Sequence, residues 1–344
     1  MRSSRHLGVL VSALAATGLL LSACGGSSSS SSSSSAPAAA TEAATAAASS
    51  APATGAADAG VAGKKVVLLT VSQSCDYCAT HTDAFNKIAK DAGIEVTQVV
   101  NEFDKTVQAT QVEQAIAQKP DAIVLWPADA TAIVPSLEKI KAAGIPVIVT
   151  NSMPQTEDDS LYVAYTGPND YNNGVSAAEA MIQGFAEKGF GDKGNIVVVT
   201  GVPGTPPAIQ RLKGIEETLA KEAPGIKIVG NLNADWDTTK ATTATANLLT
   251  QYGKDGIQGI YAQADNMLAG SIAAVKQAGD DPSKLALVGS NCSIEGYNAI
   301  ESGEQFGTVL QSPIADGEAA ADALIKLLAG TDQEKMQYIP AEVI

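Results

Sequence analysis

Short apolar runs, rich in β-branched residues, alternate with amphipathic stretches from Lys64 onward. The runs cover residues 66–71, 94–100, 122–125, 147–150, 196–200, 226–229, 259–261 and 285–288. Apolar residues follow one another within each run without strict alternation, which is typical of strands covered on both faces. Between the runs apolar residues recur at helical spacing, as at Leu212, Ile215 and Leu219. Strands that alternate with helices form βαβ units, so the sequence predicts an α/β fold with parallel sheets.

The series of runs falls into two halves. About five strands are predicted up to Thr166, and a similar series restarts at Asn195. The sequence therefore predicts two doubly wound lobes. In open sheets of this kind ligands bind beyond the carboxyl ends of the strands, so each strand-to-helix loop is a candidate site segment. These loops are rich in Asn, Asp, Gln, Ser and Trp and poor in Lys, Arg and His.

The amino-terminal segment has the pattern of an export signal. Arg2 and Arg5 precede an apolar run over 7–21, which is short for a membrane-spanning helix, and Leu-Ser-Ala leads into Cys24. This spelling resembles the lipobox of bacterial lipoproteins, which implies removal of residues 1–23 and acylation of Cys24. The open alternative is a plain secretory signal with an incidental cysteine. Both predict a protein that works outside the cytoplasm.

Residues 24–63 are mostly Ser, Ala, Thr, Pro and Gly. Such a segment cannot bury enough apolar surface to offset the entropy of ordering, so it is predicted to be a tether between the acylated cysteine and the folded lobes. The whole chain has 37 acidic and 22 basic residues, a formal net charge of −15. This balance argues against nucleic acid as a partner and against contact with an anionic membrane beyond the lipid anchor. A small neutral or cationic partner suits it better, although solubility alone also explains the acidity.

Several segments follow the predicted strands in a characteristic order. They are Val71-Ser72, Trp126-Pro127-Ala128-Asp129, Ala143-Gly144-Ile145-Pro146-Val147, Gly201-Val202-Pro203-Gly204-Thr205 with Arg211 and Gly214, Ala234-Asp235-Trp236-Asp237, Ala262-Gln263-Ala264-Asp265, Val288-Gly289 and Gln311. Over Lys64–Ile344 the chain thereby resembles the type I periplasmic sugar-binding proteins of the ribose-binding kind. Sugar-responsive repressors share these lobes, but they begin with a DNA-binding segment where this chain has an export signal.

The resemblance implies an interrupted chain with crossovers near 166–168, 311–313 and 338–340. One lobe would be residues 64–167 plus 312–337, and the other 168–311 plus 338–344. Thin connections between two rigid bodies make a hinge, and a ligand between the lobes would favour the closed form. The resemblance further implies that a membrane permease recognises this closed form, and that the receptor is a monomer.

Ligand contacts of the family fall on Ser72, Asp76, Tyr77, Trp126, Asn151, Ser152, Ile209, Trp236, Asp265, Asn291 and Gln311. Several of these depart from the ribose pattern. Asn151-Ser152 replaces an Asp-Arg pair, Ile209 replaces a sugar-clamping arginine, and Asn291 replaces Asp. The expected pocket therefore lacks charged, fork-shaped donors and uses amides, which both donate and accept. A neutral sugar or polyol is the expected ligand.

Trp126 and Trp236 both fall in loops of the expected cleft. Their indole rings are predicted to stack on C–H faces of the ligand. The alternative is that each ring fills the interior of its lobe, since buried tryptophan is common.

Cys75-Asp76-Tyr77-Cys78 lies between a predicted strand and a predicted helix. In an exported chain such a pair favours a structural disulfide, which would stiffen a ligand loop. The alternative is a redox-active pair at a helix N-terminus. A zinc site that adds His81 and Cys292 is a further alternative, but half of its spacing pattern is missing. Cys292 by itself is expected to be a small buried residue or a free thiol near the pocket.

No catalytic set is found elsewhere: the sequence has no Gly-x-Ser-x-Gly elbow and no phosphate loop. The predicted function is a lipid-anchored, extracytoplasmic solute receptor of an ABC importer, which is not an enzyme and needs no cofactor or metal. Two alternatives remain open at this point: a membrane-tethered thiol-disulfide oxidoreductase that uses Cys75 and Cys78, and a receptor for a signalling furanose such as autoinducer-2.

Overall fold

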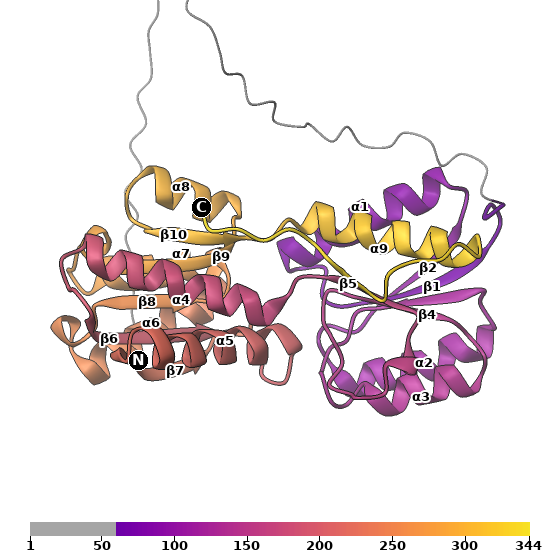
Figure 1. The fold of residues 1–344 in the computed structure, drawn as a ribbon, viewed down its shortest axis with the longest axis horizontal. Helices are drawn as coiled ribbons and strands as arrows, with labels where there is room; N and C mark the ends of the chain where they lie inside the picture. The colour runs from indigo at the N-terminus through magenta and orange to yellow at the C-terminus, as the bar shows by residue number, and fades with distance from the viewer. Residues whose placement is uncertain (1–59) are drawn as a thin grey trace, which may run out of the picture. The chain divides into compact units, whose positions relative to one another are not determined.

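Two parallel β-sheets organise residues 60–344, the part of the chain that this computed structural model describes (Figure 1). The predicted export signal, the acylation site at Cys24 and most of the tether lie outside the described residues. Within residues 60–344 no helix is both long enough and apolar enough to cross a membrane.

The first sheet has six strands in the order β11-β5-β4-β3-β1-β2, and all neighbours are parallel. Its strands are β1 (Lys65–Thr70), β2 (Glu95–Val100), β3 (Ala122–Leu125), β4 (Val147–Thr150), β5 (Ala164–Gly167) and β11 (Met336–Tyr338). Its helices are α1 (Asp76–Asp91), α2 (Lys105–Gln118), α3 (Val134–Ala142), the short 3₁₀ helix η1 (Asp159–Leu161) and α9 (Pro313–Leu328). Apolar clusters join α1 and α9 to one face, and α2 and α3 to the other.

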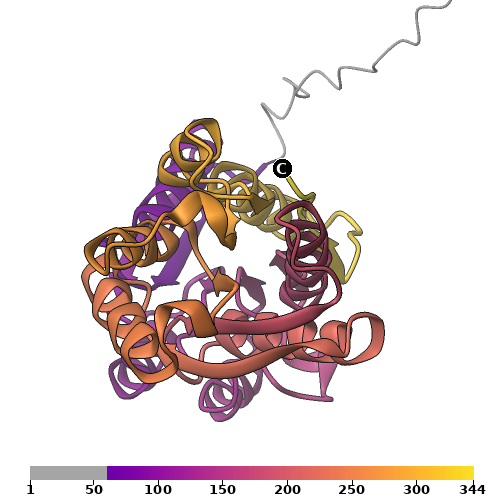
Figure 2. The same ribbon diagram turned by 90° about the vertical axis from the view of Figure 1, so that its left-hand side faces the viewer.

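The second sheet has five parallel strands in the order β10-β9-β8-β6-β7. Its strands are β6 (Lys193–Thr200), β7 (Gly225–Asn233), β8 (Gly259–Ala262), β9 (Ala286–Asn291) and β10 (Gly307–Leu310). Its helices are α4 (Asp170–Glu187), α5 (Pro206–Glu222), α6 (Thr238–Tyr252), η2 (Lys254–Gly256), α7 (Asp265–Gln277), η3 (Pro282–Lys284) and α8 (Ile294–Glu301). Helices α4 and α5 cover one face, and α6 and α7 cover the other, so helices lie on both sides of these strands (Figure 2).

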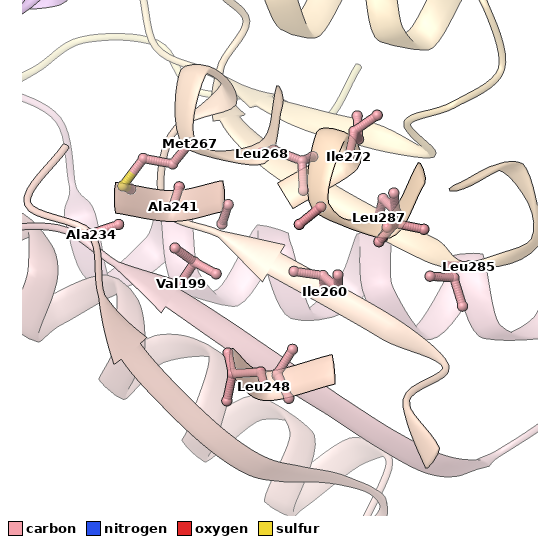
Figure 3. Close-up of a cluster of buried hydrophobic side chains, with 14 of the residues drawn as sticks. Val199, Ala234, Ala241, Leu248, Ile260, Met267, Leu268, Ile272, Leu285 and Leu287 are labelled. Atoms are coloured by element: carbon pink, nitrogen blue, oxygen red, sulfur yellow. The ribbon is translucent and has the colours of Figure 1, made fainter. Parts of the chain in front are cut away.

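Each sheet is apolar on both faces. In β1, Val66 and Leu68 join the cluster with α1 and α9, whereas Val67 and Leu69 join the cluster with α2 and α3. A strand covered on both sides has no polar face, which explains the unbroken apolar runs in the sequence. The corresponding cluster between the second sheet and helices α6 and α7 is shown in Figure 3.

The chain passes between the sheets after β5, after β10 and after β11. After the last of these passages, Val343 forms an antiparallel bridge with Val309 of β10. The strand β11, which follows α9, is hydrogen-bonded to β5 of the first sheet. Neither sheet is therefore built from one continuous stretch of sequence.

The structure adds strands that the apolar runs do not predict. Both β10 and β11 are short and lie at sheet edges, and β7 continues to Asn233 although its predicted run ends at Val229. The last three residues of β7 are exposed. Strands β10 (Gly-Thr-Val-Leu) and β11 (Met-Gln-Tyr) are too short and too mixed in residue type to form an apolar run.

Candidate functional site

A cavity of about 450 Å³ lies among the loops that follow the strands of both sheets. Its lining comes from segments after β1 to β4 in the first sheet, and after β6 to β10 in the second. This is the edge at which open α/β sheets bind ligands. The two sets of loops touch next to the cavity, where the N–H of Ala130 donates to the carbonyl of Gly204 over 3.0 Å.

The structure brings most of the predicted ligand residues together. Those that line the cavity are Asp76, Tyr77, Trp126, Asn151, Ser152, Trp236, Asn291 and Gln311. Asp76 is exposed, whereas Trp126, Asn151, Ser152 and Gln311 are buried. The buried part of the lining therefore includes the amides of Asn151 and Gln311 and the indole of Trp126.

Three predicted ligand residues are not part of the lining. Ser72 is buried, and its hydroxyl pairs with that of Ser74 at 2.8 Å. Asp265 begins α7 and is held inside the second lobe by the hydroxyl of Thr308 at 2.9 Å and the amide of Gln305 at 2.9 Å. Both side chains support loops of the site from behind.

Ile209 is the third, and it was placed wrongly by the sequence comparison with the ribose pattern. Its side chain on α5 is 40% exposed. Arg211, two residues later, lies about 200° further around the helix and lines the cavity with only 3% exposure. The expectation of a pocket without a guanidinium is therefore wrong.

Four of the five N–H donors of the Arg211 guanidinium bind protein groups. Its Nε donates to Asp170 Oδ1 at 2.9 Å, its Nη1 to the carbonyl of Gln263 at 2.7 Å, and its Nη2 to Gln311 Oε1 at 2.6 Å. Burial raises the pKa of Asp170 to about 6, and Arg211 opposes that rise. At neutral pH the two groups form a buried ion pair, so the wall carries no uncompensated positive charge here.

Arg211 also fixes the orientation of two amides. Its Nη1 lies 3.3 Å from Asn291 Oδ1, and Gln311 Oε1 accepts from both Arg211 and Asn173 Nδ2, the latter at 2.8 Å. Because Gln311 Oε1 accepts two hydrogen bonds and Asn291 Oδ1 accepts one, the NH₂ groups are the main polar groups that these side chains can still offer. This wall of the cavity is rich in hydrogen-bond donors.

A second chain of hydrogen bonds runs along the wall made by the first sheet. Trp126 Nε1 donates to Ser152 Oγ at 3.1 Å, and Ser152 Oγ donates to Asn151 Oδ1 at 3.1 Å. Asn151 has a φ of 59°, a left-handed conformation that asparagine tolerates better than most residues. This backbone conformation, in the loop after β4, places the Asn151 side chain in the wall of the cavity.

The two tryptophans differ in their surroundings. Trp126 is buried against Val71 and Cys78 in the lobe interior and also lines the cavity. Trp236 is half-buried and also lines the cavity. A Cβ at Gly201 would overlap the Trp236 indole, so glycine is needed there for the ring to lie in this position.

The cysteine motif lies at the start of α1, on the cavity wall. Cys75 and Cys78 are paired as a disulfide with their Cα atoms 5.2 Å apart, and Cys75 Sγ accepts from the N–H of Cys78 at 3.3 Å. Cys292 lines the cavity as a free thiol whose pKa is raised by burial and by the nearby Asp265 carboxylate. A raised pKa leaves little reactive thiolate at neutral pH.

His81 does not complete a zinc site. Its Nε2 lies 2.9 Å from the hydroxyl of Thr150, and burial lowers its pKa to about 3. Within the described residues no group of three or more histidine, cysteine, aspartate or glutamate side chains is arranged to hold a metal ion. The zinc alternative is not supported by this geometry.

The sequence is similar to proteins that bind small solutes outside the cytoplasm. A family model described as "Periplasmic binding protein domain" matches residues 66–332. The xylitol-binding protein of Mycolicibacterium smegmatis is 33% identical over 278 residues, which cover 80% of this chain and 76% of that protein. The ribose import binding protein of Bacillus subtilis is 28% identical over 258 residues, which cover 75% of this chain and 79% of that protein.

A solved structure agrees with the fold described above. The ABC transporter solute binding protein from Agrobacterium vitis with bound D-fucose has a TM-score of 0.74 and 26% identity, over 81% of this chain and 94% of that chain. These similarities confirm the resemblance seen in the sequence and the α/β fold with two parallel-sheet lobes. They give no support to the thiol-disulfide oxidoreductase or to the autoinducer-2 alternative.

Proposed function

Because the chain belongs to the periplasmic binding protein domain family, we propose that it is the extracytoplasmic solute-binding receptor of an ABC importer, with a small neutral sugar or polyol as its ligand. It is a binding protein and not an enzyme. The observation that carries the ligand class is the pairing of Arg211 with Asp170, because the one guanidinium of the wall is neutralised inside the protein. An anionic ligand would find no free charge there, whereas hydroxyl groups can use the amides.

Six cavity residues are proposed as the main ligand contacts: Tyr77, Trp126, Asn151, Trp236, Asn291 and Gln311. The amides would hydrogen-bond hydroxyl groups, and the indole faces would cover C–H groups. The cavity of about 450 Å³ lies within the range of small-molecule sites. The xylitol and ribose specificities of the similar proteins support the same class of ligand.

We further propose that residues 64–167 plus 312–337 and residues 168–311 plus 338–344 act as two lobes that close on the ligand. The connections after β5, β10 and β11 would form the hinge. The contact between Ala130 and Gly204 supports a closed arrangement, because it joins loops of the two sheets beside the cavity. A membrane permease would then recognise the closed form of the monomer.

The membrane anchor rests on sequence alone. Acylation of Cys24 after removal of residues 1–23, with residues 24–63 as a tether, would hold the receptor at the outer face of the membrane. In that oxidising setting Cys75 and Cys78 would remain a structural disulfide, which their N-terminal position on α1 and their pairing in the fold support.

The ligand class is tested by thermal denaturation and calorimetry of the purified receptor with xylitol, D-ribose, D-fucose and myo-inositol. At a free ligand concentration of 100 times Kd, a true ligand should stabilise the fold by about 2.7 kcal/mol. Trp236→Ala should weaken binding about tenfold or more, because it removes a stacking face. The matched control is Tyr297→Ala, an exposed aromatic residue outside the cavity. Absence of heat and of stabilisation with every neutral compound would refute the ligand class.

A further inference from the structure

A buried carboxylate lies one layer behind the cavity. Asp316, in the first turn of α9, has 0% exposure and is not part of the cavity lining. No lysine or arginine forms an ion pair with it among residues 60–344. Burying a carboxyl group without a charged partner is costly, so hydrogen bonds from neighbouring side chains must offset part of that cost.

Both donors that satisfy Asp316 belong to the cavity wall. Its Oδ2 accepts from the hydroxyl of Tyr77 at 3.0 Å and from Asn151 Nδ2 at 2.7 Å. Tyr77 comes from α1 and Asn151 from the loop after β4, so a single carboxylate holds side chains of two different elements. We propose that Asp316 is a positioning residue that orders Tyr77 and Asn151 and thereby sets the affinity of the cavity for its ligand.

The proposal rests on the proposed function and makes it more specific. Tyr77 gives its only proton to Asp316, so its oxygen remains as an acceptor, whereas Asn151 Oδ1 already accepts from Ser152 Oγ and has one lone pair left. Asn291 offers its NH₂ group as a donor, and the Gln311 side chain interacts with the Tyr77 hydroxyl. A ligand hydroxyl both donates and accepts, so a polyhydroxylated molecule can satisfy both walls at once. An ether or a carbonyl at the Tyr77 side would leave acceptor facing acceptor.

The carboxyl group is poised between two protonation states. Burial raises the pKa of Asp316 to about 7, while the bonds from Asn151 and Tyr77 oppose the rise. Its Oδ1 has no hydrogen-bond partner within the described part of the chain, which leaves a place for a proton. An ionised carboxylate is the stronger acceptor, so it holds the two wall residues more firmly than the neutral acid does.

Of the other ionisable groups that face Asp316, only Asp170 gains a proton in the same range of pH. The groups that face it are Tyr77 and His81 from α1, Tyr165 from β5, Asp170 from α4 and Arg211 from α5. His81 lies 3.9 Å from Oδ1, but its pKa of about 3 keeps it neutral. Burial raises the pKa values of both tyrosines well above the ordinary value of 10.0. Asp170, with a pKa of about 6, is paired with Arg211.

The sign of the pH effect follows from this arrangement. If the ligand prefers the wall ordered by the ionised carboxylate, binding lowers the pKa of Asp316. Affinity is then complete above the free-state pKa of about 7 and falls as the pH drops below it. We expect the Kd for xylitol, or for whichever neutral compound of the panel binds, to rise at least threefold between pH 8 and pH 5.5.

Two substitutions at Asp316 distinguish an effect on the order of the cavity wall from a general loss of stability. Asp316→Asn keeps a neutral acceptor, so it should bind like the wild type at pH 5.5 and lose the part of the pH dependence that has its midpoint near pH 7. Asp316→Leu removes the acceptor and should weaken binding about tenfold or more at every pH. Thr245→Val is the control for loss of a buried polar group, because Thr245 pairs with Ser271 between α6 and α7, away from the cavity. Wild-type affinity for Asp316→Leu, or an unchanged pH dependence in Asp316→Asn, would overturn the proposal.

A readout without ligand distinguishes failure of this inference from failure of the ligand class. The side-chain amide signal of Asn151, assigned by its loss in Asn151→Asp, should shift with a midpoint near pH 7 in the NMR spectrum of the wild type and stay fixed in Asp316→Asn. If no compound of the panel binds but this titration is seen, the ligand class fails and the ordering role stands. If the Asn151 signal does not titrate, the ordering role fails whatever the ligand is.

Discussion

Arg211 is the residue on which the donor-rich wall of the cavity depends. Its guanidinium is buried with Asp170 and holds the amide oxygen of Gln311. Removal of one partner from a buried ion pair leaves an uncompensated charge. Arg211→Met should therefore lower the free energy of unfolding by about 3–5 kcal/mol, as measured by urea denaturation.

Lys213→Met on the same helix is the matched control for this substitution. Its ammonium group is more than half exposed and lies 4.0 Å from Glu217, so its loss should change stability by less than about 1 kcal/mol. Equal effects of the two substitutions would contradict the structural role assigned to Arg211. Addition of Asp170→Asn to Arg211→Met should restore part of the lost stability, because the orphaned carboxylate is removed.

Two of the expected ligand residues that line the cavity follow strands directly. Trp126 and Asn151 are the first residues after β3 and β4, so the strand pattern alone fixes their place. Ile209 and Arg211 lie on a helix, where two positions in sequence mean opposite faces. One signal was available: Arg211 is the only arginine after Arg5. The chain uses lysine at its other basic positions after Arg5, so an arginine at 211 indicates a place where several hydrogen bonds in a planar arrangement are needed. The role of Asp316 could not be predicted, since its partners are far away in sequence.

Helices α4 and α5 show how close packing of whole elements positions that arginine. A Cβ at Gly174 of α4 would overlap the backbone carbonyl of Arg211, and a Cβ at Gly214 of α5 would overlap that of Tyr171. Backbone atoms cannot move aside without separating the helices. Gly174→Ala and Gly214→Ala should each destabilise the fold by about 1–3 kcal/mol in urea denaturation, although alanine is the better helix former.

Gly256→Ala is the control for this pair, because its added methyl group would meet nothing closer than 3.8 Å and its φ is not positive. Its stability should remain within about 0.5 kcal/mol of the wild type. If Gly174→Ala were as harmless as Gly256→Ala, the contact between the two helices would not be as tight as described. Gly174→Ala should also weaken ligand binding, since the added methyl group displaces the segment that contains Arg211.

Two fully buried strands were predicted to the residue, whereas the equally buried β5 (Ala164–Gly167) is not covered by any predicted apolar run. The central strands β3 and β4 have the predicted bounds, because every residue in them is buried and the apolar runs are unbroken. The edge strands β10 and β11 were not predicted, since pairing with a neighbouring strand and not apolar patterning defines them. The pattern of apolar residues reflects which side chains are buried. This signal is weak where a strand is defined mainly by its hydrogen bonds to a neighbouring strand.

At the scale of the whole molecule, the fold class and its family could be recognised from the sequence, because the order of many loop segments is a stronger signal than any one of them. The hydrogen-bond network behind the cavity could not be recognised from the sequence. Its members come from α1, the loop after β4, β5 and α9, and only the folded sheet order brings these together.

The buried carboxyl groups give the whole molecule a pH-dependent stability. Burial raises the pKa values of Asp170 and Asp265 to about 6 and that of Asp316 to about 7, from an ordinary value of 3.8. The folded chain therefore binds more protons than the unfolded chain between about pH 4 and pH 7. The stability contributed by these protons is complete below the unfolded pKa and is lost as the pH rises through the folded pKa.

His81 acts in the opposite direction. Its pKa is lowered from 6.5 to about 3, so the stability of its neutral form is present above pH 6.5 and is lost as the pH falls. Three raised groups outweigh one lowered group over the range from pH 7 to pH 5. Urea denaturation should therefore give a higher free energy of unfolding at pH 5 than at pH 7.5, and Asp316→Asn should reduce this difference. A stability that is greatest at pH 7.5 and is unaffected by Asp316→Asn would mean that these carboxyl groups are hydrated, and the inner wall of the cavity would then have to be wet.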